Sequence, residues 1–177
     1  MAEAFSNKIS TSVGITTTDT GASVGIGSTN ITGLTITGIA VSDMVVNQHF
    51  RGGTKVYSVG SGIVTVTTTS TNTTAASSQS VSFLGPTTAY TAAAKSILIG
   101  GTFSNLTDNQ VSIYVELFDS SVGAGSNICN DIPVPTGSSF VISDAGKTVV
   151  EVPDEIVVYC DTADAIDVSL SILTGVS

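Results

Sequence analysis

Acid–base chemistry is the first chemistry to consider, because the chain contains one histidine, His49, within the segment 47–53. A catalytic base needs a nucleophile and an orienting carboxylate close to it in space. The residues that flank His49 in the sequence supply neither partner. We therefore interpret His49 as a loop or interface residue, with a catalytic or pH-sensing role as the alternative, and we predict that the protein is not an enzyme.

A calcium site is the second candidate, because Asp161, Asp164 and Asp167 are closely spaced carboxylates that could bind the ion through oxygen. In an extended chain Asp161 and Asp167 project to one face, while Asp164 points away from it. We favour a solvated hairpin turn from Asp161 to Asp164, with a calcium site as the alternative. The sequence predicts neither a metal nor a cofactor.

Cys129 and Cys160 are the cysteines of the chain, and neither belongs to a CxxC motif or to a Cys/His cluster. A structural zinc ion needs about four ligands, so these residues do not indicate one. We favour two small buried residues on neighbouring strands, because free cysteine is commonly buried and reducing compartments disfavour disulfides. A disulfide between the two is the alternative.

The balance of charge argues against two classes of partner. The 177 residues include five Lys plus Arg and fourteen Asp plus Glu, which gives a formal net charge of −9. This charge repels phosphate backbones and anionic membranes, and no apolar run approaches the ~20 residues of a membrane span. We expect no direct nucleic-acid binding and no membrane binding. The first residues do not resemble a signal peptide, so we expect a cytosol-like compartment.

The elements that would position these residues are strands. Short β-branched segments with period-two alternation predict an all-β fold. The clearest segments are 97–99, 111–117, 149–152, 156–159 and 166–172. Within 111–117, alternation places Val111, Ile113, Val115 and Leu117 on a core face, and Ser112, Tyr114 and Glu116 on the opposite face.

Turn residues indicate two domains. Between residues 92 and 177 they separate about seven strands, which predicts an antiparallel β-sandwich of immunoglobulin-like or jelly-roll type. Residues 34–84 contain further Thr-rich strands, and the segment Gly85–Thr88 separates the two halves. We therefore predict two small antiparallel β domains: an N-terminal arm and small β-domain over 1–86, and a C-terminal sandwich over 87–177.

Three segments of the C-terminal half, 130–142, 146–159 and 165–172, carry a pattern of alternation and turns that resembles a β-sandwich module of tailed-bacteriophage virion proteins. The pattern is similar to that in phages of marine cyanobacteria. The segments 41–45, 53–56, 64–66 and 81–83 more loosely resemble a small β-domain of similar phage proteins. The resemblance implies a virion structural protein, assembled in the host cytoplasm, and it transfers no catalytic or ligand residues.

Among virion roles we favour a capsid decoration protein, or cement protein, that binds the outer surface of the major capsid protein as a homo-oligomer, with a trimer favoured. The negative charge suits an outer surface better than one facing DNA. Candidate contacts to the capsid or to neighbouring virion proteins are Phe5 in the N-terminal arm 1–9, together with His49, Phe50 and Arg51. A neck or tail subunit (collar, tube or fibre attachment) is the alternative. A carbohydrate-binding module is a third, with Tyr57, Tyr90, Tyr114 and Tyr159 as its tyrosine candidates.

Overall fold

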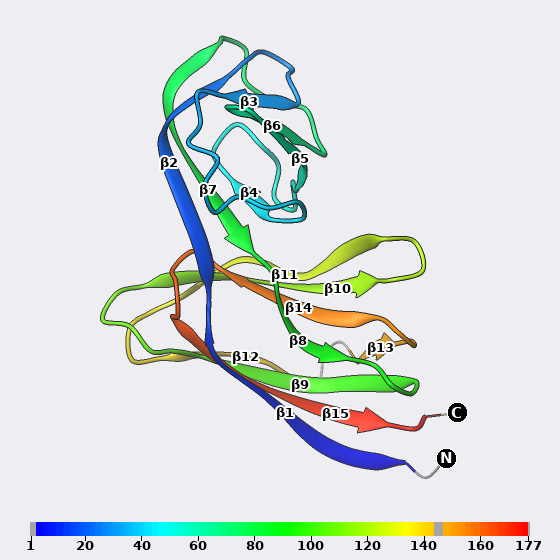
Figure 1. Ribbon diagram of the computed structural model, residues 1–177. Helices are drawn as coiled ribbons and strands as arrows, with labels where there is room; N and C mark the ends of the chain where they lie inside the picture. Colours follow the sequence, from blue (N-terminus) through cyan, green and yellow to red (C-terminus); the bar gives the residue numbers. More distant parts are fainter. Residues whose placement is uncertain (1–2, 144–146, 177) are drawn as a thin grey trace. The chain divides into compact units, whose positions relative to one another are not determined.

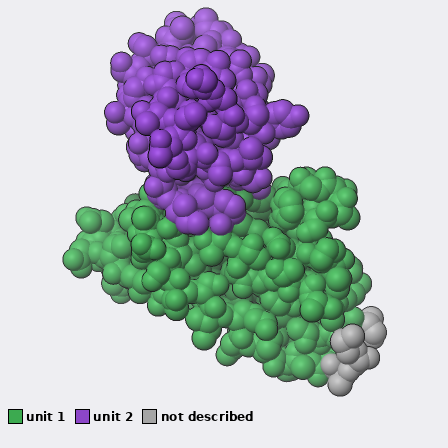
Figure 2. Space-filling model, in the orientation of Figure 1, with its two compact units in different colours: residues 1–14, 87–177 green, residues 15–86 purple. Residues whose placement is uncertain are grey.

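The chain folds entirely into strands and loops in the part that the structure describes. A computed structural model describes residues 3–143 and 147–176. Its strands are antiparallel throughout (Figure 1), which confirms the all-β prediction. The strands predicted from alternation correspond to observed ones, and the seven strands β9 to β15 lie between residues 92 and 177. Contacts divide the chain into two units, 1–14 with 87–177 and 15–86 (Figure 2).

The first unit is a sandwich of two sheets around one apolar core. Its strands are β1 (Ala4–Val13), β8 (Thr87–Thr91), β9 (Ser96–Asn105), β10 (Val111–Asp119), β11 (Ala124–Val134), β12 (Ser139–Ile142), β13 (Thr148–Val150), β14 (Glu155–Cys160) and β15 (Ile166–Thr174). Sheet 1 has the order β1-β15-β9-β12, with β13 also paired to β9. Sheet 2 has the order β11-β10-β14-β8.

Alternate residues of each strand supply the sandwich core, as period-two patterns require. In β10 the core face carries Val111, Ile113 and Val115, with Leu117 packed against them, as predicted. In β15 the core residues Val168, Leu170 and Ile172 alternate with exposed serines. The outer face of β10 differs from the expectation, because Tyr114 and Glu116 are also buried.

Residues 3–14 belong to the sandwich, and the predicted domain 1–86 is corrected accordingly. Strand β1 pairs with β15 along its length, from Ala4 opposite Thr174 to Val13 opposite Ile166. The segment expected to be a free arm is therefore an edge strand of sheet 1 from Ala4 onward, while Met1 and Ala2 lie outside the described residues. The cause is pairing between the two ends of the chain, which local sequence patterns do not reveal.

The second unit is a small closed barrel. Its strands are β2 (Ile15–Val24), β3 (Asn30–Thr32), β4 (Met44–Val46), β5 (Val56–Gly60), β6 (Ile63–Val66) and β7 (Ala76–Gly85), in the order β4-β7-β2-β3-β6-β5. A bridge between Met44 and Lys55 joins the two end strands. The N–H of Val45 donates to the carbonyl of Thr54 at 2.8 Å beside it. Closure leaves few free strand edges and encloses a core that includes Ile31, Val64 and Phe83.

Candidate interaction surface

The outer face of sheet 1 carries an apolar row that crosses four strands. Phe5 of β1 lies opposite Leu173 of β15, Leu173 lies opposite Ile97 of β9, and Ile97 lies opposite Val149 of β13. All four side chains point away from the sandwich core, because the positions that alternate with them, such as Leu98 and Ile172, are the buried ones. Phe5 is 79% exposed. Solvent therefore covers a continuous line of large apolar groups.

A second row runs across the same face. Ile9 of β1 lies opposite Ser169 of β15, Ser169 opposite Thr102 of β9, and Thr102 opposite Val141 of β12. Ile9 is 71% exposed, and Val141 is also exposed. Single exposed apolar residues, such as the two that end this second row, are normal on protein surfaces, but a contiguous apolar row such as the first indicates a binding surface. We call the outer face of sheet 1, with these two rows, the neutral face.

A shallow hollow of about 480 Å³ lies on this face, and part of the second row lines it. Its lining includes Gly100, which lies opposite Ser171, together with Ile99, Val141 and Ser169. A side chain at Gly100 would meet the backbone carbonyl of Ile142, so glycine is required there. The neutral face therefore combines a projecting phenyl group with a recess on the same surface.

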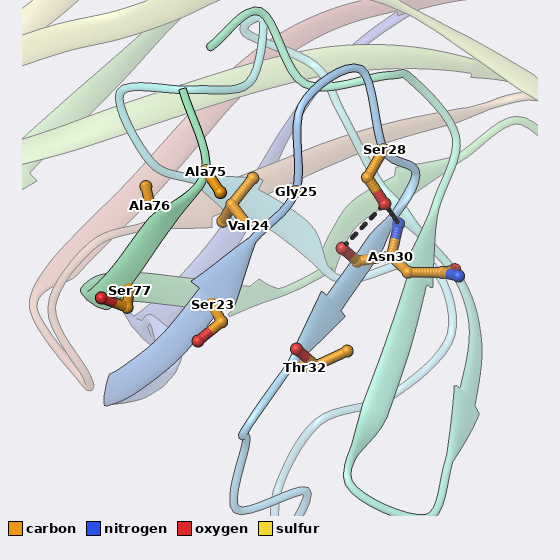
Figure 3. Close-up of a pocket in the computed structure, with 9 residues that line it drawn as sticks. All are labelled: Ser23, Val24, Gly25, Ser28, Asn30, Thr32, Ala75, Ala76 and Ser77. Atoms are coloured by element: carbon orange, nitrogen blue, oxygen red, sulfur yellow. Dashed lines mark hydrogen bonds between the residues drawn. The ribbon is translucent and has the colours of Figure 1, made fainter. Parts of the chain in front are cut away.

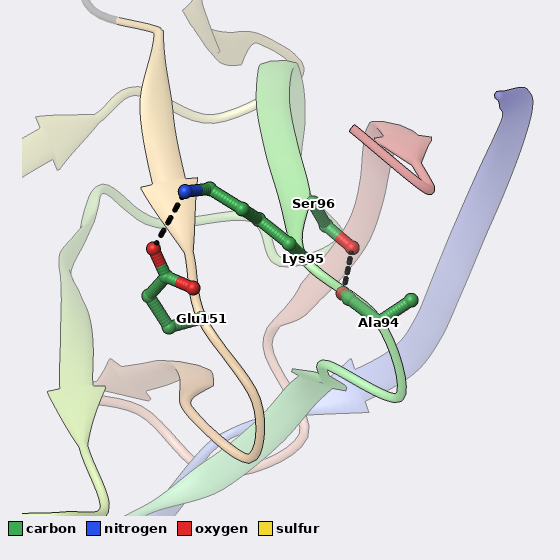
Figure 4. Close-up of polar contacts among 4 residues, drawn as sticks. All are labelled: Ala94, Lys95, Ser96 and Glu151. Carbon is green, nitrogen blue, oxygen red and sulfur yellow. Dashed lines mark hydrogen bonds and ion pairs between the residues drawn. The ribbon is translucent and has the colours of Figure 1, made fainter. Parts of the chain in front are cut away.

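Ionisable groups of the described strands stay at the ends of this face. At one end, Lys95 and Glu151 form an ion pair (Figure 4), in which Lys95 Nζ lies 3.0 Å from Glu151 Oε1. Lys95 and Glu151 are each two residues from a member of the first row, Ile97 and Val149 respectively. Close by, the Ser96 hydroxyl donates to the carbonyl of Ala94. At the other end, Asp167 accepts a hydrogen bond from the backbone N–H of Ser12 at 3.0 Å. Between the ends, the outward positions of the strands carry aliphatic, aromatic, hydroxyl and amide groups, and the exposed Lys147, directly before β13, is the described charge that borders them.

The charge of the chain is divided unequally between the two units. In residues 15–86, the acids Asp19 and Asp43 balance the bases Arg51 and Lys55. The whole net charge of −9 therefore belongs to residues 1–14 and 87–177. The neutral face is an uncharged region on the acidic unit.

The residues predicted as contacts around His49 have different environments in the barrel. Phe50 is only 8% exposed and belongs to the barrel core, so its assignment as a partner contact is wrong: the loop turns its ring inward. Arg51 is exposed, and its carbonyl accepts bonds from the Thr54 N–H and hydroxyl, which fix the turn. His49 Nε2 lies 3.2 Å from Gln79 Oε1. Its side-chain partners in the described structure are amides, as suits a loop histidine.

Cys129 and Cys160 are not joined in a disulfide, so that alternative is wrong. Cys129 lies on β11 and Cys160 on β14, and these strands flank β10 rather than each other, so the prediction of neighbouring strands is wrong. Cys160 is fully buried in the sandwich core, whereas Cys129 is half-buried. Burial raises the pKa of Cys160 to about 11 and also raises the pKa of Cys129, which lowers their reactivity as thiolates.

Two of the three aspartates considered for calcium use their carboxylates in other hydrogen bonds. Asp161 accepts a hydrogen bond from the Thr162 hydroxyl at 3.0 Å, whereas Asp164 contacts the carbonyl of Gly14 through its backbone N–H. Asp167 binds the Ser12 N–H, as described above. Within residues 3–143 and 147–176, no group of three or more His, Cys, Asp or Glu side chains is arranged to hold a metal ion.

The barrel contains an open pocket of about 530 Å³, shown in Figure 3. Its lining consists mostly of small and hydroxyl-bearing residues, among them Ser23, Ser28 and Ser77, together with the amide of Asn30. The Ser28 hydroxyl accepts a hydrogen bond from the Asn30 N–H at 2.9 Å, so part of this polar lining is satisfied internally. The lining has no ionisable side chain, and the pocket offers no acid, base or nucleophile of tuned reactivity.

The tyrosines do not form an aromatic platform in the described structure. Tyr57 is 69% exposed on β5, whereas Tyr90, Tyr114 and Tyr159 are buried. A single exposed tyrosine gives little support to the carbohydrate-binding alternative.

Sequence reasoning identified Phe5 but missed the residues aligned with it. Ile97, Leu173, Val149 and Val141 all occupy the non-core positions of their strands. The available signal was the run Ile97–Ile99, which places aliphatic side chains on both faces of one strand. Such runs occur where both faces of a sheet are covered.

No helix among the described residues is long and apolar enough to cross a membrane. Comparisons with protein-family models, curated proteins and solved structures find no match to this chain.

Proposed function

We propose that the protein is a structural subunit of a virus particle, and specifically a capsid decoration protein of a tailed bacteriophage. The observation that carries the structural part of this proposal is the neutral face, where Phe5, Ile9 and their cross-strand neighbours form an uncharged binding surface. The virion assignment rests on the resemblance of the C-terminal segments to phage β-sandwich modules. The proposal gives the protein no catalytic step.

The distribution of charge supports an outward position on a shell. The acidic unit would repel packaged DNA and other acidic surfaces, while the barrel carries no net charge and would not oppose docking. On the barrel, the turn at Arg51 is held in place by two hydrogen bonds from Thr54 and presents its guanidinium to solvent. We assign the contact with the major capsid protein to this turn and the neighbouring His49.

The test is binding of the purified protein to empty expanded capsids of the cognate phage, with occupancy counted by cryo-electron microscopy. Regular occupancy across the shell is the expected result. Arg51→Glu should reduce it at least about tenfold, because reversing a contact charge costs more than a rim interaction contributes. Lys147→Glu, which makes the same change of charge on the other unit, is the matched control.

Two results would contradict the proposal. Density only at the portal vertex or along the tail would replace the decoration role with a neck or tail role. Equal loss of occupancy in Arg51→Glu and Lys147→Glu would mean that net charge, rather than the turn at Arg51, governs binding.

A further inference from the structure

We propose that the neutral face is a self-association surface, which binds the same face of a second copy of this chain. Phe5 of each copy would enter the hollow at Gly100 of the other copy. The inference deepens the proposed function by naming a partner, but it concerns a contact that forms without the capsid.

Shape is the first argument. Phe5 projects from β1, and the hollow at Gly100 lies on β9, two strands away on the same face. The separation across the strands is about 10 Å, from a strand spacing of ~4.8 Å. A two-fold axis that runs within the interface, midway between Phe5 and Gly100, exchanges the two sites. Each phenyl ring then meets the hollow of the partner, which is the self-complementary relation that an isologous interface requires.

Charge is the second argument. Each sandwich carries the whole net charge of −9, so two copies repel each other in most orientations. The outward strand positions of the neutral face between Asp167 and the Lys95–Glu151 pair carry no charge, and the exposed Lys147, directly before β13, is the described charge that borders them. Face-to-face contact therefore brings few like charges together. A second copy can therefore approach through this face with little local repulsion. A strongly acidic or basic partner would find no complementary charge there.

Area is the third argument. Four strands at ~4.8 Å spacing and about eight residues at ~3.3 Å each give a face of roughly 500 Å² in projection. The accessible area is larger than the projection because side chains stand above the sheet. It therefore approaches the ~800 Å² per partner of a standard specific interface. Face-to-face packing of two such sheets is an established arrangement, with the sheets ~10 Å apart.

The edge strand β1 supports this orientation over edge-to-edge pairing. Lys8 lies on the core side of β1, opposite Leu170, and is exposed. An inward-pointing charge on an edge strand opposes extension of the sheet by another strand. Contact through the face remains open, because Phe5 and Ile9 point outward.

The first experiment is sedimentation velocity of the full chain over a range of concentrations and of sodium chloride. We expect a reversible dimer, in contrast with the trimer expected from the sequence. Added salt should strengthen the dimer, because it screens repulsion between the acidic units while leaving the apolar contact intact. A chain that stays monomeric at all concentrations and salt levels overturns the inference, as does a trimer.

Variants then locate the contact. Phe5→Asp should weaken dimerisation about 30-fold or more, as removal of a central aromatic anchor does. Val122→Asp is the matched control, because Val122 is similarly exposed, at 70%, in the turn between β10 and β11. It should leave the dimer unchanged. Equal weakening by both variants overturns the inference, and thermal melting checks that each variant is folded.

A charge exchange tests the specific pairing of Phe5 with the hollow. Phe5→Lys and Ser171→Asp should each weaken the homodimer, since each places a charge within the interface. An equimolar mixture of the two variants should form a heterodimer, detected by native mass spectrometry with one variant isotopically labelled. In it, the new lysine faces the new aspartate. Failure of the mixture to associate overturns this pairing.

The same variants separate this inference from the proposed function. If the Phe5→Asp variant is monomeric but still binds the capsid, the neutral face is the self-association surface, and the contact with the capsid lies at another part of the protein. If the wild-type chain is monomeric and the Phe5→Asp variant occupies fewer capsid sites than the wild type, self-association is overturned. The virion role is then supported.

Discussion

The hydroxyl of Tyr159 donates a hydrogen bond to Glu116 Oε2 at 3.0 Å, and both residues are buried on the outer side of sheet 2. The two side chains belong to the adjacent strands β14 and β10. A buried carboxylate needs hydrogen-bond donors, because removing it from water is otherwise costly. The pair therefore holds the outer side of sheet 2 in one arrangement.

Replacing Tyr159 with phenylalanine removes this donor without removing the ring. We expect the free energy of unfolding to fall by about 1–3 kcal/mol, the usual cost of leaving a buried polar group without one of its partners. Urea unfolding followed by circular dichroism measures the change. Tyr57→Phe, at the exposed tyrosine of the barrel, should stay within about 0.5 kcal/mol of the wild type. Equal effects of the two substitutions would contradict a structural role for the Tyr159 hydroxyl.

Gly125 on β11 lies against the same carboxylate. A Cβ atom at this position would overlap the Glu116 side chain, so the carboxylate would have to leave its position beside Tyr159. We expect Gly125→Ala to cost roughly 1–3 kcal/mol of unfolding free energy. Gly60→Ala is the control, because a Cβ there makes only ordinary contacts.

A double-mutant cycle connects the two positions. If Glu116 must leave Tyr159 to accommodate an alanine at 125, Gly125→Ala should cost less in the Tyr159→Phe background than in the wild type. Strict additivity of the two substitutions in the unfolding free energy would show that the two effects are independent.

Alternation predicted those parts of the fold that depend on local sequence. The core face of β10, with Ile113 and Val115, follows from period two alone, and so does the core face of β15. The burial of Tyr114 and Glu116 does not follow, because alternation assigns both to the face opposite the core. Phe50 is a similar case: its polar surroundings suggested a surface loop, but the ring completes the barrel core.

The neutral face could be predicted only in part. Phe5 stands out in a polar N-terminal segment, but its alignment with Leu173, Ile97 and Val149 depends on the register of four strands. A slip of one residue in any strand would turn its member of the row toward the core. The pairing of β1 with β15 joins opposite ends of the chain, and neither strand carries a local signal for the other.

Cys160 should make stability fall at alkaline pH. Its pKa is raised from 9.0 to about 11 in the folded state, first through burial. Below about pH 9 the thiol is protonated in both states, but above it the unfolded chain releases the proton first, so the free energy of unfolding falls as pH approaches about 11. Urea unfolding between about pH 8 and about pH 10 should show a steeper fall for the wild type than for Cys160→Val.

The comparison with Cys160→Val is needed because Tyr114 also lowers the free energy of unfolding as the pH rises. Burial, and then the nearby Asp131, raises the pKa of Tyr114. Ionisation of this tyrosine in the unfolded state also lowers stability at high pH, in both proteins. If the wild type and Cys160→Val lose stability in parallel over the whole range, burial of the thiol does not contribute.

The barrel should fold without the sandwich. Residues 15–86 contain all six of its strands, the Met44–Lys55 bridge that closes it, and a core of their own. A fragment of these residues should therefore give a dispersed amide NMR spectrum and a cooperative thermal transition, although a domain of this size is only marginally stable. A collapsed amide spectrum at low temperature would mean that the barrel depends on the remainder of the chain.

The sandwich should fold as a separate unit only when β1 is supplied. Residues 87–177 alone leave one edge of β15 unpaired and lack Val13 of the core. Because Ala4 lies opposite Thr174, a short glycine linker can join the end of β15 to the start of β1 as a hairpin. A circular permutant that runs from residue 87 to 176, through the linker, to residues 3–14 should therefore unfold cooperatively.

The fragment 87–177 should be less stable than this permutant by several kcal/mol, because it loses a whole strand of core packing and hydrogen bonds. Equal urea midpoints for the two would show that β1 adds nothing to the sandwich.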